Sequence, residues 1–288
     1  LKGLTQKEFT TALAATYARW PEPCRLRADL AGRRGDAAAE RTRLLEARAR
    51  DPSHRPTRER LAALGEPDPA EALFAEHAVD LEAARRDHVD AGTGDSVVKV
   101  VDAATVYVWP DGSQETLTQD LWQVRDLQGC EQLGELRLSG DVLRVATWKA
   151  DGREHVPVRV AGAYVMPSLE PGDFVVSVTR EVQPAPPGGA LRIGAWYFTS
   201  EEMPFRLSRY VLRLPDALAL REERRNLQGV VTTAMQPDFD GAVMVYEARD
   251  QARVLDEPGA PPRSHWLPWV EWGQDADVVA HVAELAVG

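Results

Sequence analysis

The segment from Ala146 to Val178 constrains the fold more than any other part of this 288-residue chain. Apolar stretches flank Asp151-Gly152, and another follows Pro171-Gly172. An Asp-Gly pair between two strands favours a two-residue hairpin turn, because these residues tolerate the positive φ angles that the turn requires. Pro-Gly fits the centre of a type II turn, whose second central position needs glycine. The segment therefore predicts strands that double back on one another, as in an antiparallel β domain.

Strand candidates continue through the rest of the chain after the short Gly92–Asp95 stretch, which we interpret as a domain boundary. Valine, threonine, tyrosine and tryptophan become common there, and turn residues separate the candidates at short intervals. The predicted strands are 97–109, 114–124, 135–138, 142–149, 154–160, 174–181, 191–200, 206–214, 217–223, 229–234 and 242–249. Alternating apolar residues in several of them indicate one buried face. We predict an antiparallel β-sandwich over residues 97–255.

Residues 1–91 are expected to be helical, because alanine, leucine, arginine and glutamate dominate and β-branched clusters are rare. Residues 26–64 fit an antiparallel helix pair whose pattern resembles the end of a tetratricopeptide repeat array. One such pair cannot bury its apolar face alone, so flanking helices are expected over Leu4–Trp20 and Pro69–His88. The fold class is therefore α+β multidomain, with residues 256–288 forming a proline-rich linker and a short helix over Asp275–Ala286.

Several motifs in the β-rich part occur in an order that resembles a known bacterial family. They are V-x-V-W-P-D-G at Val106–Gly112, K-A-D-G at Lys149–Gly152, L-E-P-G-D at Leu169–Asp173, Y-V-L-R-L-P at Tyr210–Pro215, and P-W-V at Pro268–Val270. From about residue 97 to 272 the chain resembles the domain-of-unknown-function family that lies directly N-terminal to transglutaminase-like domains. The resemblance implies an accessory β domain and a catalytic domain that begins after Gly288. Family members are often exported, which favours an exported or periplasmic location.

Charge is distributed unevenly along the chain. Residues 1–96 hold 16 basic and 17 acidic side chains, whereas residues 97–288 hold 18 and 28, a net charge of −10. Such a domain repels phosphate backbones and anionic headgroups, so nucleic acid is an unfavourable partner. No run of 18 or more apolar residues predicts a membrane-spanning segment. Protein or peptide partners, bound through the helical repeats, fit the sequence better.

A catalytic site is not indicated. The two cysteines, Cys24 and Cys130, fall in different predicted units, which excludes a disulfide framework or a multi-cysteine zinc site. Cys130 lacks the context of a transglutaminase-like nucleophile, and the next histidine, His155, lies in a predicted hairpin. Acidic pairs occur at Glu201-Glu202, at Glu222-Glu223, and at Glu170 with Asp173, and are interpreted as solvated turn and strand-edge charges.

Metal and cofactor sites are not predicted either. His77 and His88 share a helix face, but eleven residues span about 16 Å along a helix, which is too far for one ion. Residues 236–241 followed by Glu247 partly fit a calcium-loop frame, with glutamine where the first ligand should be aspartate. The residues after Gly241 favour a strand instead of a loop, so a plain Asx turn is the preferred interpretation.

Three tryptophans, Trp266, Trp269 and Trp272, lie three residues apart near the end of the predicted β domain. We expect them to dock the linker onto the domain or to contact a downstream domain, since large aromatics seldom stay exposed without a partner. Exposed tryptophans also bind sugars and proline-rich peptides. The predicted function is therefore a non-catalytic accessory region of a transglutaminase-like protein; the alternative is a free-standing extracytoplasmic glycan- or peptide-binding module.

Overall fold

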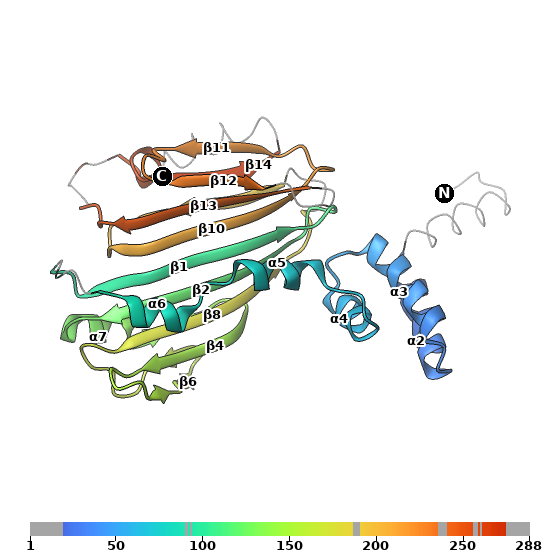
Figure 1. Cartoon of the computed structure of the whole chain (residues 1–288), viewed down its shortest axis with the longest axis horizontal. Coiled ribbons are helices and arrows are strands. Elements are labelled where there is room, and N and C mark those ends of the chain that lie inside the picture. The colour runs from blue at the N-terminus through green and yellow to red at the C-terminus, as the bar shows by residue number, and fades with distance from the viewer. Residues whose placement is uncertain are drawn as a thin grey trace, which may run out of the picture. The chain divides into compact units, whose positions relative to one another are not determined.

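The computed structural model of the chain describes residues 20–89, 92, 94–186, 191–235, 241–255, 259 and 261–274. It divides into two compact units, one formed by residues 1–73 with 109–111 and one by residues 74–108 with 112–288. The helices expected over Leu4–Trp20 and Asp275–Ala286, and most of the calcium-loop frame, lie outside the described residues. The two units are described separately (Figure 1).

The first unit is helical, as the sequence predicts. Its helices are α2 (Glu22–Arg33), α3 (Ala37–Arg50), α4 (Arg55–Ala63) and the first half of α5 (Pro69–His77). Asp36 begins α3 by accepting a hydrogen bond from the backbone amide of Ala39 at 3.0 Å. The two turns that follow α2 and α4 contain glycines with positive φ angles, at Gly35 and Gly65. The assignment of these helices to a tetratricopeptide repeat remains a prediction.

A buried ion pair stabilises the first unit. Arg58 donates two hydrogen bonds from Nη1 to the Asp68 carboxylate, at 2.9 and 2.7 Å, and its guanidinium lies 4.7 Å from the centre of the Trp109 ring. The Asp68 carboxylate also accepts the backbone amide of Ala70 at 3.0 Å. The side chain of Arg58 has no exposed surface. Loss of either partner would leave an uncompensated charge away from water.

Replacing Arg58 with alanine is expected to lower the free energy of unfolding of the helical unit by about 3–5 kcal/mol, because Asp68 would remain buried and ionised. Urea unfolding followed by far-ultraviolet circular dichroism measures this loss. The matched control is Arg43→Ala, which removes an exposed pair with Glu46 and should cost less than about 1 kcal/mol. Equal effects of the two substitutions would contradict the role assigned to Arg58.

The second unit is built on a long mixed sheet. Within the described residues, eight strands follow the order β12-β13-β10-β1-β2-β8-β4-β5. They are β1 (Val97–Val108), β2 (Gln114–Val124), β4 (Asp141–Trp148), β5 (Glu154–His155), β8 (Phe174–Gln183), β10 (Phe205–Pro215), β12 (Val231–Met235) and β13 (Gly241–Gln251). Two smaller sheets contain β11 (Arg221–Arg225), β14 (Trp269–Gly273) and β9 (Arg192–Tyr197), and β3 (Glu135–Leu136), β7 (Ala163–Val165) and β6 (Val158–Val160). An α+β architecture is thus confirmed.

The prediction of a wholly antiparallel sheet is wrong at one pair. Strand β1 runs parallel to β10, with Lys99 opposite Phe205 and Tyr107 opposite Arg213. Parallel strands need a long connection, and about a hundred residues separate these two. Local turn signals give the direction of hairpin partners only, so the sequence contained no indication of this pair.

The two faces of the large sheet are covered by different elements. Helix α6 (Leu81–Asp87) lies on one face, where Leu81 packs with Val101, Leu121 and Val176 (Figure 1). Backbone groups of Val79 exchange two hydrogen bonds with the Gln119 side chain, at 2.9 and 3.1 Å, and hold the start of this helix on the sheet.

The opposite face carries the sheet β11-β14-β9 over β1, β10 and β13, in a core that includes Phe198, Tyr210, Tyr246 and Val270. Next to it, helix α7 (Leu127–Leu133) and the sheet β3-β7-β6 cover a second core with Trp122 and Val175. Neighbouring residues of β2 and β8 therefore point into different cores, which is the alternation expected of a sheet buried on both faces.

The turns agree with the sequence at one site and differ at the other. Gly172 has φ +96°, and the Asp173 amide donates to the Glu170 carbonyl at 3.1 Å, so the type II turn is confirmed. At the Asp-Gly hairpin only Gly152 has a positive φ, and its amide donates to the Lys149 carbonyl at 2.9 Å. The loop is therefore longer than the predicted two-residue turn, because only one of its residues adopts the left-handed region.

Strand boundaries follow the predictions closely where hydrophobic alternation is strong. The predicted strand 154–160 divides into β5 and β6, and the predicted strand 217–223 shifts to β11. Helix α7 and strands β7 and β14 had not been predicted. These three elements are too short for the spacing of their apolar residues to indicate a helix or a strand.

Candidate functional site

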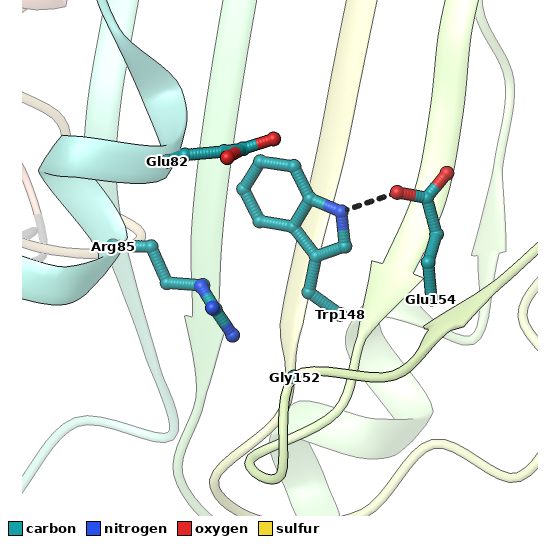
Figure 2. Close-up of a pocket in the computed structure, with 5 residues that line it drawn as sticks. All are labelled: Glu82, Arg85, Trp148, Gly152 and Glu154. Carbon is teal, nitrogen blue, oxygen red and sulfur yellow. Dashed lines mark hydrogen bonds between the residues drawn. The ribbon is translucent and has the colours of Figure 1, made fainter.

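A small recess with charged side chains at its edge lies beside the Asp-Gly hairpin of the second unit. Helix α6 contributes Glu82 and Arg85, and strand β4, the hairpin and β5 contribute Trp148, Gly152 and Glu154 (Figure 2). Its volume is about 130 Å³. The hairpin that most strongly constrained the fold therefore also forms one wall of this recess.

The indole of Trp148 forms the floor of the recess. Its Nε1 donates to Glu154 Oε2 at 2.8 Å (Figure 2). Arg144 Nη2 contacts the same oxygen at 2.8 Å. Guanidinium groups flank the ring, with Arg144 4.9 Å and Arg85 5.6 Å from its centre. These contacts lower the pKa of Glu154, chiefly through its hydrogen bonds with Trp148 and Arg144. The Trp148 ring is consequently held in place by the polar groups around it.

The size of the recess limits what it can bind. Sites for cofactors and drug-sized ligands usually measure about 300–1,000 Å³, well above this volume. A single side chain of a partner protein fits better, and the mixed charges of Glu82, Arg85 and Glu154 favour a polar or zwitterionic contact. The recess is therefore smaller than a usual cofactor site.

Lys149 organises the loop below the recess. Its ammonium donates to Asp173 Oδ2 at 2.6 Å, to Glu170 Oε2 at 2.9 Å and to the Ser168 carbonyl at 2.8 Å. The hydrogen bonds that Lys149 donates to Asp173 and Glu170 raise the pKa of Lys149. The same bond to Glu170 lowers the pKa of Glu170. The interpretation of Glu170 and Asp173 as solvated charges is wrong for Asp173, which is buried, and Lys149, which the sequence reasoning did not connect to them, offsets one of their two negative charges.

Cys130 lies in helix α7 in surroundings that disfavour a thiolate. Burial raises the pKa of its thiol, and the carboxylates of Asp173 and Asp126 raise it further. A cysteine nucleophile requires the opposite environment, with cationic neighbours that stabilise the thiolate. The electrostatics thus give Cys130 the character of a packed side chain.

In a Cys24→Ala background, Cys130 is expected to react with iodoacetamide several-fold more slowly in the folded chain than in urea at pH 8, because less thiolate is present when the thiol pKa is raised. Its pH–rate profile should be displaced to higher pH. Mass spectrometry of timed samples measures both effects. Rapid alkylation of the folded chain below pH 7 would contradict this environment and restore Cys130 as a candidate nucleophile.

Close approach of α7 to β1 fixes the position of Cys130. The Gly129 amide donates to Asp126 Oδ1 at 2.8 Å, and a Cβ atom at Gly129 would lie only 2.2 Å from the Ser96 carbonyl oxygen. Glycine is therefore required for contact between the helix and the strand backbone.

Gly129→Ala is expected to lower the free energy of unfolding by about 1–3 kcal/mol, because the backbone of Ser96 or of α7 must move. Gly194→Ala in β9 is the control, since its Cβ meets no atom within 4 Å, and a change within about 0.5 kcal/mol is expected. Thermal or urea unfolding of both variants tests the difference. Wild-type stability of Gly129→Ala would show that the contact is less close than described.

The prediction that His77 and His88 share one helix face is wrong, because the helix expected over Pro69–His88 is divided into α5 and α6 and His88 lies just after α6. His77 is buried in α5, and burial lowers its pKa. His88 follows α6, where its Nε2 lies 2.9 Å from Gln123 Oε1 and its ring meets Phe174 edge-on at 6.0 Å. Among the described residues no group of three or more histidine, cysteine or acidic side chains is arranged to hold a metal ion.

The remaining acidic candidates lie on strands and bends. Glu247 belongs to β13, as the strand interpretation predicted, and its carboxylate accepts from Arg249 Nε at 2.7 Å. Glu222 accepts the Tyr246 hydroxyl at 3.1 Å, and Glu223 follows it in β11. Glu201 and Glu202 occupy the bend before β10.

Each of the three clustered tryptophans donates its indole N–H within the second unit. Trp266 donates to the Pro261 carbonyl at 2.8 Å, Trp269 to the Ser264 carbonyl at 2.6 Å, and Trp272 to the Tyr246 hydroxyl at 3.2 Å. Trp269 is buried, whereas the other two are partly exposed. Two of these bonds lie within the segment and one reaches Tyr246 of β13, while a role of the tryptophans in docking or in ligand binding stays a prediction.

Comparison with known proteins finds similarity to solved structures only. No family model matches the chain, and no curated protein matches it. A “putative protease” from Parabacteroides distasonis shares 13% sequence identity with a TM-score of 0.54. The match covers 62% of this chain and 40% of the other chain, so this chain spans less than half of that protein. Likeness at this identity shows a shared fold alone.

None of the helices in the described part of the chain combines the length and the apolar character that crossing a bilayer requires. This agrees with the absence of a long apolar run in the sequence. It leaves the location of the protein open.

Proposed function

We propose that this chain is a non-catalytic accessory region of a larger transglutaminase-like protein, in which the β unit positions a cysteine-dependent catalytic domain and contacts its protein substrates. The observation that carries the proposal is the structural match to a chain described as a “putative protease”. This match covers only 40% of that longer chain. A β domain inside a longer protein of that kind is the arrangement that the motif resemblance also implies.

Two features of the second unit support an accessory role. Cys130 is surrounded by burial and carboxylates that disfavour a thiolate, which makes this thiol unsuitable for acyl transfer. The recess over Trp148 offers room for one partner side chain beside charged groups from α6 and β5. Such a contact can fix the orientation of a neighbouring domain without taking part in its chemistry.

The complete gene product is the material for the test. We expect its coding sequence to continue into a domain with a cysteine, a histidine and an acid, and we expect purified residues 1–288 alone to show no peptide hydrolysis or amine incorporation. Arg85→Glu in the complete protein should reduce activity at least about tenfold if the recess orients the catalytic domain, since one such contact contributes about 1–3 kcal/mol.

Arg86→Glu is the matched control, because Arg86 is the exposed neighbour of Arg85 on α6 and does not line the recess. It should leave activity unchanged. The proposal would be overturned if the Arg85→Glu variant and the variant lacking residues 97–274 were each as active as the complete protein. A gene that encodes no domain with a cysteine, a histidine and an acid would also overturn it.

A further inference from the structure

A lysine and two aspartates meet inside the second unit, on the face of the large sheet opposite α6. Lys99 and Asp102 lie on β1, and Asp120 lies on β2 directly across from Asp102. Residues three apart on a regular strand point to opposite faces, but a register shift between Lys99 and Val101 turns both side chains to the same face. The irregularity in β1 therefore brings an amine to two carboxyl groups.

Aromatic rings enclose the lysine amine. Lys99 Nζ lies 5.4 Å from the centre of the Trp122 ring and 5.5 Å from that of Phe205. The side chains of Asp102 and Asp120 are only 9% and 13% exposed. Water is thus largely excluded, and a charged amine and two carboxylates together would be costly to bury.

The two aspartates differ in their hydrogen bonds. Asp102 accepts from Lys99 Nζ and from the Ser208 hydroxyl, the latter at 3.2 Å. Asp120 Oδ1 lies 2.9 Å from Lys99 Nζ, yet this buried oxygen receives no hydrogen bond of acceptable angle. The Ser177 hydroxyl reaches the other oxygen of Asp120, at 3.4 Å. The amine therefore forms ion pairs with both carboxyl groups, Asp102 and Asp120.

Protonation equilibria around the cluster follow from its burial. Burial raises the pKa of Asp102, which favours a neutral acid there. Burial alone would lower the pKa of Lys99, but the carboxylates of Asp102 and Asp120 outweigh it and hold the pKa above its usual range. The raised pKa of Lys99 keeps its amine protonated until a neighbouring carboxylate accepts the proton.

The choice of lysine at this position is informative in an arginine-rich chain. Only Lys2, Lys7, Lys99 and Lys149 are lysines among 34 basic residues. Arginine supplies the buried pairs of Arg58 with Asp68 and Arg180 with Glu115, whereas lysine is used in the pair of Lys149 with Asp173. A guanidinium makes better ion pairs than an ammonium in such sites, but only the lysine amine can act as a nucleophile toward a carboxyl group.

We propose that Lys99 and Asp120 form an intramolecular isopeptide bond in the folded protein. A proton moves from the Lys99 ammonium to the Asp120 carboxylate, so that a neutral amine faces a carboxylic acid. The amine lone pair attacks Cγ of Asp120, and the C–O bond to one oxygen breaks. That oxygen leaves as water, carrying the proton already received and a second proton from nitrogen. Asp102 relays these protons and ends in its starting state.

The reaction needs no oxidant or cofactor, since an ammonium and a carboxylate yield an amide and one water. It replaces two buried charges by a neutral amide, which removes their desolvation cost. The bond joins neighbouring strands β1 and β2 at the centre of the large sheet. It would tie this hairpin covalently against pulling forces and thermal unfolding.

Intact-mass spectrometry of the purified, folded chain tests the proposal. The measured mass should fall below the sequence mass by one water, and peptide mapping should yield a branched peptide that joins Lys99 to Asp120. Lys99→Arg and Asp120→Ala should restore the full mass of the variant sequence. Asp102→Asn should slow or abolish formation while circular dichroism shows a folded chain.

Lys149→Arg is the matched control, because Lys149 also contacts an aspartate, Asp173, but lies beside the largely exposed Glu170. It should keep the loss of water. A folded wild-type chain whose mass equals the sequence mass after prolonged incubation at neutral pH overturns the proposal. So does a loss of water that maps to a succinimide at Asp111-Gly112 or Asp151-Gly152, or an amide joining other residues.

Discussion

The second unit depends on strand β1. It pairs with β2 on one side and with the distant β10 on the other, and almost all of its residues are buried. Its alternate side chains enter the core under α6 and the core under the sheet β11-β14-β9. Because both faces and both edges of β1 are occupied, every other element of the unit is placed either directly or indirectly by this strand.

A long-range parallel pair at the centre has a kinetic consequence. The contacts between β1 and β10 join residues about a hundred positions apart, so chain entropy must be lost before they form. The β1–β2 hairpin is local by comparison, and the antiparallel strands β10 and β13 are also closer to each other in the chain. Their early formation would present two preformed ribbons that then meet along β1 and β10.

Local patterns in the sequence were sufficient for much of the fold, and the reasons are visible in particular residues. The strand predicted over Gln114–Val124 coincides with β2, and the Pro171-Gly172 turn has the predicted type, because turn chemistry and alternation act within a few residues. The parallel β1–β10 pair and the cluster of Lys99 with Asp120 were not predictable. The parallel pair depends on which distant segments become neighbours. The cluster depends on an irregularity in β1 that the amino-acid composition does not reveal.

Candidate sites followed the same division. The sequence located Cys130 and the acidic pair Glu170 and Asp173, but not the lysine that joins that pair nor the carboxylates that surround the thiol. The recess over Trp148 likewise combines α6 with β4 and β5, which no motif connects. The use of lysine at position 99, one of only four lysines in an arginine-rich chain, was a sequence signal of a special environment, since the two cations differ in chemistry more than in charge.

Strand β14 has a position in its sheet that bears on how the protein is made. It lies between β11 and β9, although it follows both in the chain, and Trp269 and Val270 fill the core between the sheets. During synthesis on the ribosome, β9 and β11 emerge first and have no strand to join them until residue 273 has left the exit tunnel. The aromatic core therefore stays partly exposed to solvent until β14 has been synthesised. The nascent chain then depends on rapid synthesis of the remaining residues or on a chaperone.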